Sequence, residues 1–177
     1  MKINASVEGV APLLMNRYAG GDEDVKKGKA KMKKTYVPED EAEKSCYRTS
    51  DKKLFLPSTH FKASMVKAAV DFKITGKKTY KDYIKAGIFI EPVEIILDQQ
   101  EYIIHEEPVV IQRARVLSWR PRFNKWTCNF TIEITDDMIN PTVLKEILEE
   151  AGKHKGVGDH RPEYGRFKIT NWKVIEN

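Results

Sequence analysis

The chain has 177 residues, of which 41% are hydrophobic and 32% are charged, so it holds enough apolar material for one domain with its own core. Thirty-one Lys and Arg residues outnumber 26 Asp and Glu residues, and the net charge of +5 favours an anionic partner. Cys46 and Cys128 form no zinc-ligand motif, so we expect two reduced, buried thiols and neither a metal nor a cofactor. Without a long apolar run or a signal peptide, we expect a cytoplasmic protein with no membrane partner.

Polar and apolar residues alternate from Lys2 to Val10, which is typical of a strand with one buried face. The apolar periodicity then disappears between residues 16 and 53, where a lysine-rich run lies between two acidic groups. We predict that residues 16–53 are a surface insertion in a single domain that spans residues 1–177. A loop of this length is either solvated throughout or becomes ordered on a partner.

Two amphipathic helices are predicted. Ser58 and Thr59 offer a side-chain N-cap, and apolar residues then recur at helical spacing from Phe61 to Phe72. Asn140 followed by proline begins the second helix, and Gly152 is a natural C-terminal stop.

The remaining segments predict strands. Residues 88–97 form one, irregular or at a sheet edge near Pro92, and a β segment is expected at residues 102–105. Two β-type runs flank the turn-like RPRFNK, which predicts a long antiparallel hairpin over residues 109–134. The last strand covers residues 166–175, with a slip of register at Asn171. The order predicts an α+β fold, a ferredoxin-like or RRM-like βαββαβ sheet with the insertion and a β-hairpin extension.

The middle of this predicted hairpin concentrates cations and aromatic rings, with no acidic residue between Arg113 and Lys125. Cations hold phosphates and flat rings stack on unpaired bases, so the pattern favours a single-stranded nucleic acid. Strand alternation would place Arg113 and Arg115 on one face. The alternative is that the tryptophans belong to the core and the arginines only decorate the hairpin. The residues concerned are Arg113, Arg115, Trp119, Arg120, Arg122, Phe123, Lys125 and Trp126.

A glycine-rich loop, GKHKGVGDHRPEYG, covers residues 152–165. We call it the glycine loop. Its glycines permit unusual backbone angles, and exposed amides in such a loop can cradle phosphate oxygens. It matches neither the P-loop nor the dinucleotide fingerprint, which disfavours a nucleotide cofactor, and it could also be a simple turn. Its basic residues and their neighbour are Lys153, His154, Lys155, His160, Arg161 and Arg166.

Three histidines could carry catalysis. His60 lies on the first turn of the first predicted helix, and His154 and His160 lie in the glycine loop. Two histidines that meet in space could act as general base and acid and cleave RNA through its own 2′-hydroxyl without a metal. The alternative is that they are ordinary surface or phosphate-binding histidines.

Two segments point to one family. HKGVGDHRPEYGRF, between the last helix and the last strand, resembles the glycine-rich loop of the RAMP superfamily, the RNA-binding proteins of CRISPR-associated complexes. LPSTHFKASMVKAA is similar to the opening of the first helix in their backbone subunits, with Ser58 and Ala63 at two motif glycines. The resemblance implies a ferredoxin-like fold, a backbone grip on single-stranded RNA such as a guide RNA, and a role in antiviral defence. It also implies assembly as a homo-oligomeric filament or as a ribonucleoprotein subunit.

We therefore expect an RNA-binding protein, without catalysis or with weak catalysis. The alternatives are a metal-independent endoribonuclease that uses His60 with His154 or His160, and an adaptor that kept the fold without binding RNA. The residues expected to contact RNA are the cations Lys62, Arg113, Arg115, Arg120, Arg122, Lys155, Arg161 and Arg166, the rings Trp119, Phe123 and Trp126, and the loop glycines Gly156 and Gly158.

Overall fold

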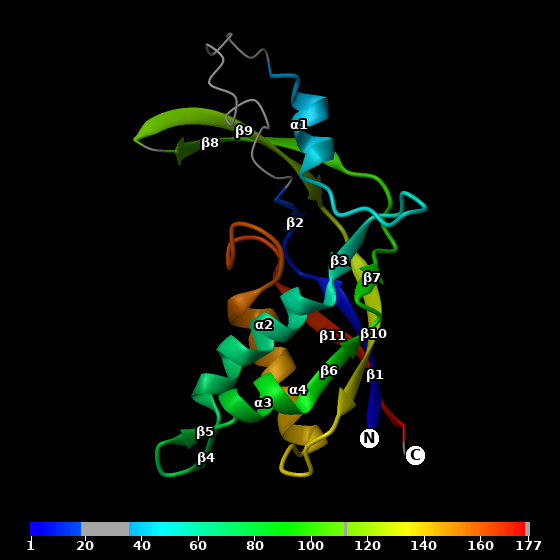
Figure 1. Cartoon of the computed structure of the whole chain (residues 1–177), viewed down its shortest axis with the longest axis vertical. Coiled ribbons are helices and arrows are strands. Elements are labelled where there is room, and N and C mark those ends of the chain that lie inside the picture. Colours follow the sequence, from blue (N-terminus) through cyan, green and yellow to red (C-terminus); the bar gives the residue numbers. More distant parts are fainter. Residues whose placement is uncertain (19–35, 112, 176–177) are drawn as a thin grey trace, which may run out of the picture.

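The computed structural model describes residues 1–18, 36–111 and 113–175, and within them the chain is α+β with four α-helices and mostly antiparallel sheets (Figure 1). The lysine-rich part of the predicted insertion, residues 19–35, lies outside the described residues. The strands are β1 (Lys2–Gly9), β2 (Leu13–Leu14), β3 (Phe55–Pro57), β4 (Lys73–Thr75), β5 (Lys78–Thr79), β6 (Ile88–Glu91), β7 (Glu94–Ile96), β8 (Ile103–Ile111), β9 (Ala114–Phe123), β10 (Thr127–Ile134) and β11 (Phe167–Ile175). The helices are α1 (Pro38–Lys44), α2 (Ser58–Ala68), α3 (Lys81–Gly87) and α4 (Pro141–Glu150), with a 3₁₀ turn η2 (Ala69–Asp71) and a π-helical turn η3 (Ala151–Lys155).

The main sheet has four antiparallel strands in the order β11-β1-β10-β6. The apolar residues of β1 and β10 alternate with polar ones, as predicted for the first strand, and α2 and α4 cover the apolar face (Figure 1). Phe61 of α2 lies with its ring centroid 4.6 Å from that of Phe130 and 5.4 Å from that of Phe167. Full burial of each such side chain contributes about 1.5–3 kcal/mol, so this layer is the main stabilising unit.

The predicted helices are present, with two corrections. Residues Phe61, Met65 and Ala68 of α2 are fully buried, but Pro57 is the N-cap residue and no side chain caps the helix. At α4 the Asn140 side chain accepts from the Thr142 amide at 2.8 Å, as predicted.

The helical path after α4 does not end at Gly152. It continues through η3 to Gly156, whose φ of +71° breaks the helix. Gly152 is needed for another reason: a Cβ there would collide with Phe167, against which the helix end packs.

The strand predicted over residues 88–97 is divided into two strands at the predicted irregularity near Pro92. β6 ends at Glu91 before Pro92, it forms an edge of the main sheet, and β7 then pairs with β3 in a separate sheet. The predicted slip near Asn171 is a register shift between β1 and β11, where Ser6 pairs with Asn171 and Val7 with Ile169.

The hairpin predicted over residues 109–134 is wrong. β8 pairs with β9 from the Ile103–Arg122 pair to the Ile111–Ala114 pair, so the chain reverses between Ile111 and Ala114. Arg113 has a φ of +70°, a left-handed conformation of the kind that two-residue hairpin turns require. RPRFNK is not a turn: its first four residues, Arg120–Phe123, end β9 in the sheet β2-β9-β8, and Asn124 and Lys125 begin the link to β10 in the main sheet. We call the β8–β9 hairpin, residues 103–123, the ribbon.

Part of the predicted insertion is folded. Helix α1 packs on the ribbon, and Ala42 and Cys46 are buried, so this part of the segment is folded against the protein itself, which is neither of the two expected alternatives. Burial, reinforced by the Glu43 carboxylate, raises the pKa of the Cys46 thiol to about 12. Cys46 and Cys128 are both buried free cysteines, as the sequence predicted.

Candidate nucleic-acid interface

The glycine loop is docked on β2 through its backbone. The Asp159 amide donates to the Leu14 carbonyl at 2.9 Å, and the Gly165 amide donates to the Pro12 carbonyl at 2.8 Å. Gly158 and Gly165 have φ near +80°, and a Cβ at either would meet neighbouring backbone, so both positions require glycine.

The amides of this loop are largely used inside the protein, contrary to the expectation that they would cradle phosphates. The Gly156 amide donates to Ala151 and the Val157 amide donates to Gly165. Any grip on a phosphate must therefore come mainly from side chains around the loop, and the role of Gly156 and Gly158 is to let the backbone pack closely.

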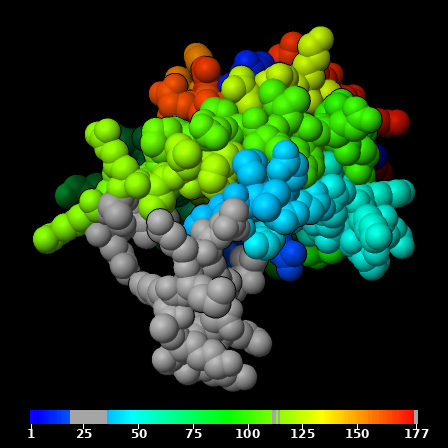
Figure 2. All heavy atoms as spheres, turned by 90° about the horizontal axis from the view of Figure 1, so that it is seen from above, coloured from blue at the N-terminus to red at the C-terminus, as the bar shows by residue number. Residues whose placement is uncertain are grey.

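The loop and the base of the ribbon lie together. Arg120 Nε lies 2.8 Å from Asp159 Oδ2, and the Arg122 guanidinium lies 5.8 Å from the centroid of the Tyr164 ring. The His105 ring lies 5.5 Å from the same tyrosine. In the view from above, the green ribbon lies between the orange loop and the blue α1 region (Figure 2). One face of the ribbon therefore contacts the loop and the other contacts α1.

The seam between loop and ribbon carries both signs of charge. His160 Nδ1 lies 3.4 Å from Glu107 Oε2, and His105 Nε2 lies 3.5 Å from the same oxygen. Neither contact is a hydrogen bond. The Glu107 oxygen and the His105 nitrogen are therefore buried atoms without a hydrogen-bond partner. The seam is therefore of mixed charge and is not uniformly positive.

His60 lies at that margin, at the start of α2. Its ring packs edge-on to Tyr47, with centroids 5.4 Å apart, and its Nδ1 is buried without a hydrogen-bond partner. Burial lowers the pKa of His60, and the nearby Arg161 charge lowers that pKa further. The imidazole is therefore neutral at pH 7.

The three histidines are not assembled as an acid–base pair. His154 Nδ1 contacts Glu150 Oε1 at 2.6 Å on the exposed side of η3, and His160 faces Glu107 and Asp159. Among the described residues, neither makes a hydrogen bond or a ring contact with His60.

Two of the three rings proposed for stacking are core residues. Trp126 is 2% exposed and its Nε1 donates to the Ala11 carbonyl, and Phe123 is 1% exposed beside Tyr102. A buried ring offers no face to a base, so both are removed from the candidate interface. Trp119 is partly exposed, but its Nε1 donates to Glu106 on the α1 side of the ribbon.

The predicted cations are divided among different places. Lys62 Nζ donates to the Ile88 carbonyl and lies over Phe89, so it serves the contact between α2 and β6. Arg113 is a turn residue and Arg115 lies in β9, so strand alternation does not place them on one face. The cations near the glycine loop are Arg120, Arg122, Lys155, Arg161 and Arg166.

Two residues that were not predicted from the sequence lie in this region: Tyr47 packs against His60, and Arg17 lies near Tyr47. The Arg17 amide donates to the Ser45 carbonyl, and the charges of Arg17 and Asp159 both act on the Tyr47 hydroxyl. Burial is the largest cause of the raised pKa of Tyr47. Both residues fall in the segment interpreted as an insertion, which carries no motif to identify them. We call the surface formed by Arg17, Tyr47, His60, Arg122, Arg161 and Tyr164 the junction.

A hollow of about 340 Å³ adjoins the junction at the base of the ribbon. Arg122 and Lys125 line it together with the polar side chains of Gln99 and Asn124, and Glu101 is its one acidic residue. Two cations and several hydrogen-bonding groups suit an anionic ligand better than an apolar one.

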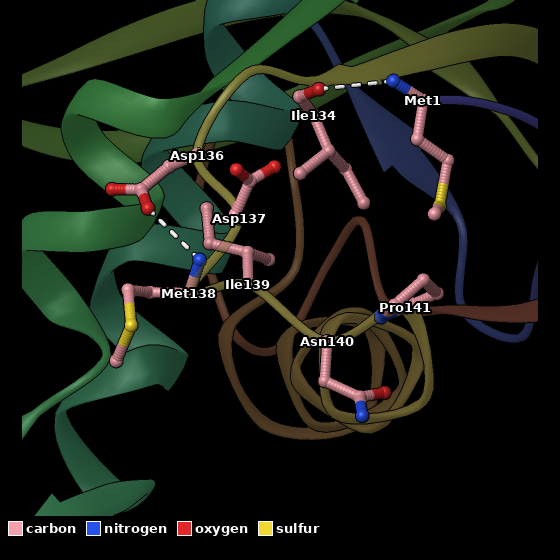
Figure 3. A pocket seen from close by; sticks show the side chains of 8 residues that line it. All are labelled: Met1, Ile134, Asp136, Asp137, Met138, Ile139, Asn140 and Pro141. Carbon is pink, nitrogen blue, oxygen red and sulfur yellow. Dashed lines mark hydrogen bonds between the residues drawn. The ribbon is translucent and has the colours of Figure 1, made fainter. Parts of the chain in front are cut away.

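A second hollow, of about 440 Å³, has the opposite chemistry (Figure 3). Asp136 and Asp137 line it together with Met1, Met138 and other apolar or uncharged residues. Its two carboxylates outnumber its one cation, the Met1 terminal ammonium, which donates to the Ile134 carbonyl. The net negative charge disfavours phosphate, so we exclude this hollow from the nucleic-acid interface.

No protein-family model matches the chain, and no curated protein is significantly similar to it. No helix in residues 1–18, 36–111 or 113–175 is long and apolar enough to cross a membrane. The same residues contain no cluster of His, Cys, Asp and Glu that could hold a metal ion.

Proposed function

We propose that the chain binds single-stranded RNA by its sugar-phosphate backbone, as a RAMP-type protein. The observation that carries the proposal is the meeting of the glycine loop, the start of α2 and the base of the ribbon at the junction. These are the two segments with family resemblance and the segment richest in arginine.

The strand order supports the same proposal. In β11-β1-β10-β6, the first and third strands of the sheet are central, α2 follows the first strand, and α4 precedes the last. We take this as a ferredoxin-like βαββαβ core, the fold that the resemblance implies, to which α1 and the ribbon are added.

The junction offers arginines that are available to bind phosphates. Asp159 is already paired with Arg120, while Arg17, Arg122 and Arg161 form no ion pair within the described residues. Phosphate contacts of this kind hold the backbone and carry little base information, so the grip is independent of sequence. Membership of a CRISPR-like ribonucleoprotein or of a filament belongs to the proposal through the resemblance alone.

Binding of a fluorescent oligouridine, followed by anisotropy over a range of salt concentrations, tests the proposal. Arg122→Glu with Arg161→Glu should weaken binding at least tenfold and reduce the salt slope by about 0.7 for each phosphate that the variant no longer neutralises. Lys168→Glu with Lys173→Glu on β11 changes the net charge equally and should have little effect. Absence of binding by the unmodified chain at low salt would contradict the proposal and favour an adaptor.

His60 supports a second candidate function, a metal-independent endoribonuclease. A neutral imidazole next to an arginine, which could hold a phosphate, is suited to act as a general base. Cleavage of RNA that persists in EDTA and is lost in His60→Ala, with RNA binding unchanged, would support this activity. Binding without cleavage would leave the first proposal standing and remove the second.

A further inference from the structure

A second basic surface lies beyond the far end of α2. Residues 73–85 carry five lysines and one aspartate, a net charge of +4, whereas the entire chain carries +5. The segment comprises the β4–β5 hairpin and most of α3, at the lower left of Figure 1. We call it the lysine patch. All five of its lysines are exposed: Lys73, Lys77, Lys78, Lys81 and Lys85.

No carboxylate neutralises these lysines by direct pairing. Within the described part of the chain, none of the five forms an ion pair, and Lys78 Nζ instead lies 4.9 Å from the centroid of the Tyr83 ring. The Tyr80 ring lies 6.4 Å from that of Tyr83, and a Cβ at Gly76, in the hairpin turn, would meet nothing within 4 Å. Unpaired like charges repel one another, so this surface is suited to a polyanion.

The lysine patch and the glycine loop are connected along one side of the protein. Lys155, which ends η3 before the loop glycines, lies with Nζ 3.7 Å from Asp71 Oδ2. Asp71 ends η2 and Lys73 begins β4. From His60 to Lys73 the chain runs along α2 and η2 over roughly 20 Å, at about 1.5 Å per residue. This distance equals roughly six stacked nucleotides at about 3.4 Å each.

We propose that the lysine patch is a second phosphate-contact surface, which receives the RNA strand after it leaves the junction along α2. This inference rests on the proposed function and adds to it the direction of the strand and the length of the site. It predicts that affinity rises with oligonucleotide length, because an RNA that occupies only the junction cannot reach Lys77 and Lys78.

Two oligouridines of different length test the inference, one of about four nucleotides, too short to span from His60 to Lys73, and one of about eighteen. Lys77→Glu with Lys78→Glu should weaken binding of the longer RNA at least fivefold, reduce its salt slope by about 1.4, and leave the shorter RNA unaffected. Lys168→Glu with Lys173→Glu again serves as the control, because it replaces the same number of exposed lysines on β11. Circular dichroism should show both double variants folded, since all four side chains are exposed.

The outcomes separate this inference from the proposed function. If Arg122→Glu with Arg161→Glu weakens both RNAs while the Lys77 and Lys78 variant binds both normally, the lysine patch does not touch the RNA and the inference is wrong, but the junction remains. If the unmodified chain binds neither RNA, both proposals fail. Equal loss in the Lys77 and Lys78 variant and in the β11 control also contradicts the inference, because it reveals a general effect of net charge.

Discussion

The main sheet and the junction are held together by different forces. The sheet rests on apolar contacts between α2, α4 and the buried faces of β1 and β10. The junction depends on an arginine–aspartate pair, on backbone hydrogen bonds from the glycine loop, and on two partly exposed histidines beside the Glu107 carboxylate. The sheet therefore supplies the folding free energy, and the junction exposes charge that folding does not need.

The largest expected effect is a difference in stability between two tryptophan variants, one in the core and one on the ribbon that contributes to the junction. Trp126→Ala removes a fully buried ring and should destabilise the protein by about 3–5 kcal/mol. Trp119→Ala, on the partly exposed face of the ribbon, should cost less than about 1 kcal/mol. Urea denaturation of both variants measures the difference. Comparable losses would mean that the ribbon is as important to stability as the core.

The second prediction concerns the docking of the glycine loop. Gly165→Ala forces a Cβ into the Val157 backbone at a φ of +76°, whereas Gly76→Ala meets open space at a φ of +58°. We expect the Gly76 variant to cost about 1 kcal/mol and the Gly165 variant at least about 2 kcal/mol. Urea midpoints measure both costs. If they are equal, only the backbone conformation matters and the loop is not tightly docked on β2.

The third prediction tests the contact between loop and ribbon. Arg120 and Asp159 form a half-buried pair at 2.8 Å, for which we expect a coupling free energy of about 1 kcal/mol. A double-mutant cycle with Arg120→Gln and Asp159→Asn measures it from the unfolding free energies. Strictly additive losses would show that the pair does not join the loop to the ribbon.

The smallest expected effect is a pH dependence. The pKa of His60 is lowered in the folded state, whereas the unfolded chain takes up a proton near the ordinary value of about 6.5. The contribution of neutral His60 to stability is therefore complete above this pH and is lost as the pH falls below it. Between pH 7.5 and pH 5.5, the urea midpoint should fall further for the unmodified chain than for His60→Gln. An identical fall in both would contradict the assignment.

Elements that bury one face could be predicted from the sequence, whereas features that depend on long-range packing could not. The spacing of apolar residues was sufficient to predict α2, α4, β1 and β11, because each element buries one face and its apolar residues therefore recur at the period of the helix or strand. The turn between Ile111 and Ala114 was missed since VVIQRARV is β-prone on both sides of the turn and contains no Gly, Asn or Asp. The stacking roles of Phe123 and Trp126 failed for a related reason: their burial depends on the chain crossing between two sheets.

The site was predicted in part. The sequence singled out Arg122 and Arg161 as separate candidates, and the structure brings both to the junction. Tyr47 and Arg17 could not be assigned to the site from the sequence, because their position depends on long-range packing of a segment that lacks apolar periodicity. The internal use of the loop amides was equally invisible, since it requires knowledge of where β2 lies.

Photocrosslinking with oligouridine that contains 4-thiouridine, followed by peptide mapping, tests the central claim most directly. The account predicts crosslinked peptides at the start of α2, around Arg122 and in the glycine loop, with further crosslinks in residues 73–85 for the longer RNA. Crosslinks confined to the polar face of β1, β10 and β11, with none at these segments, would contradict it.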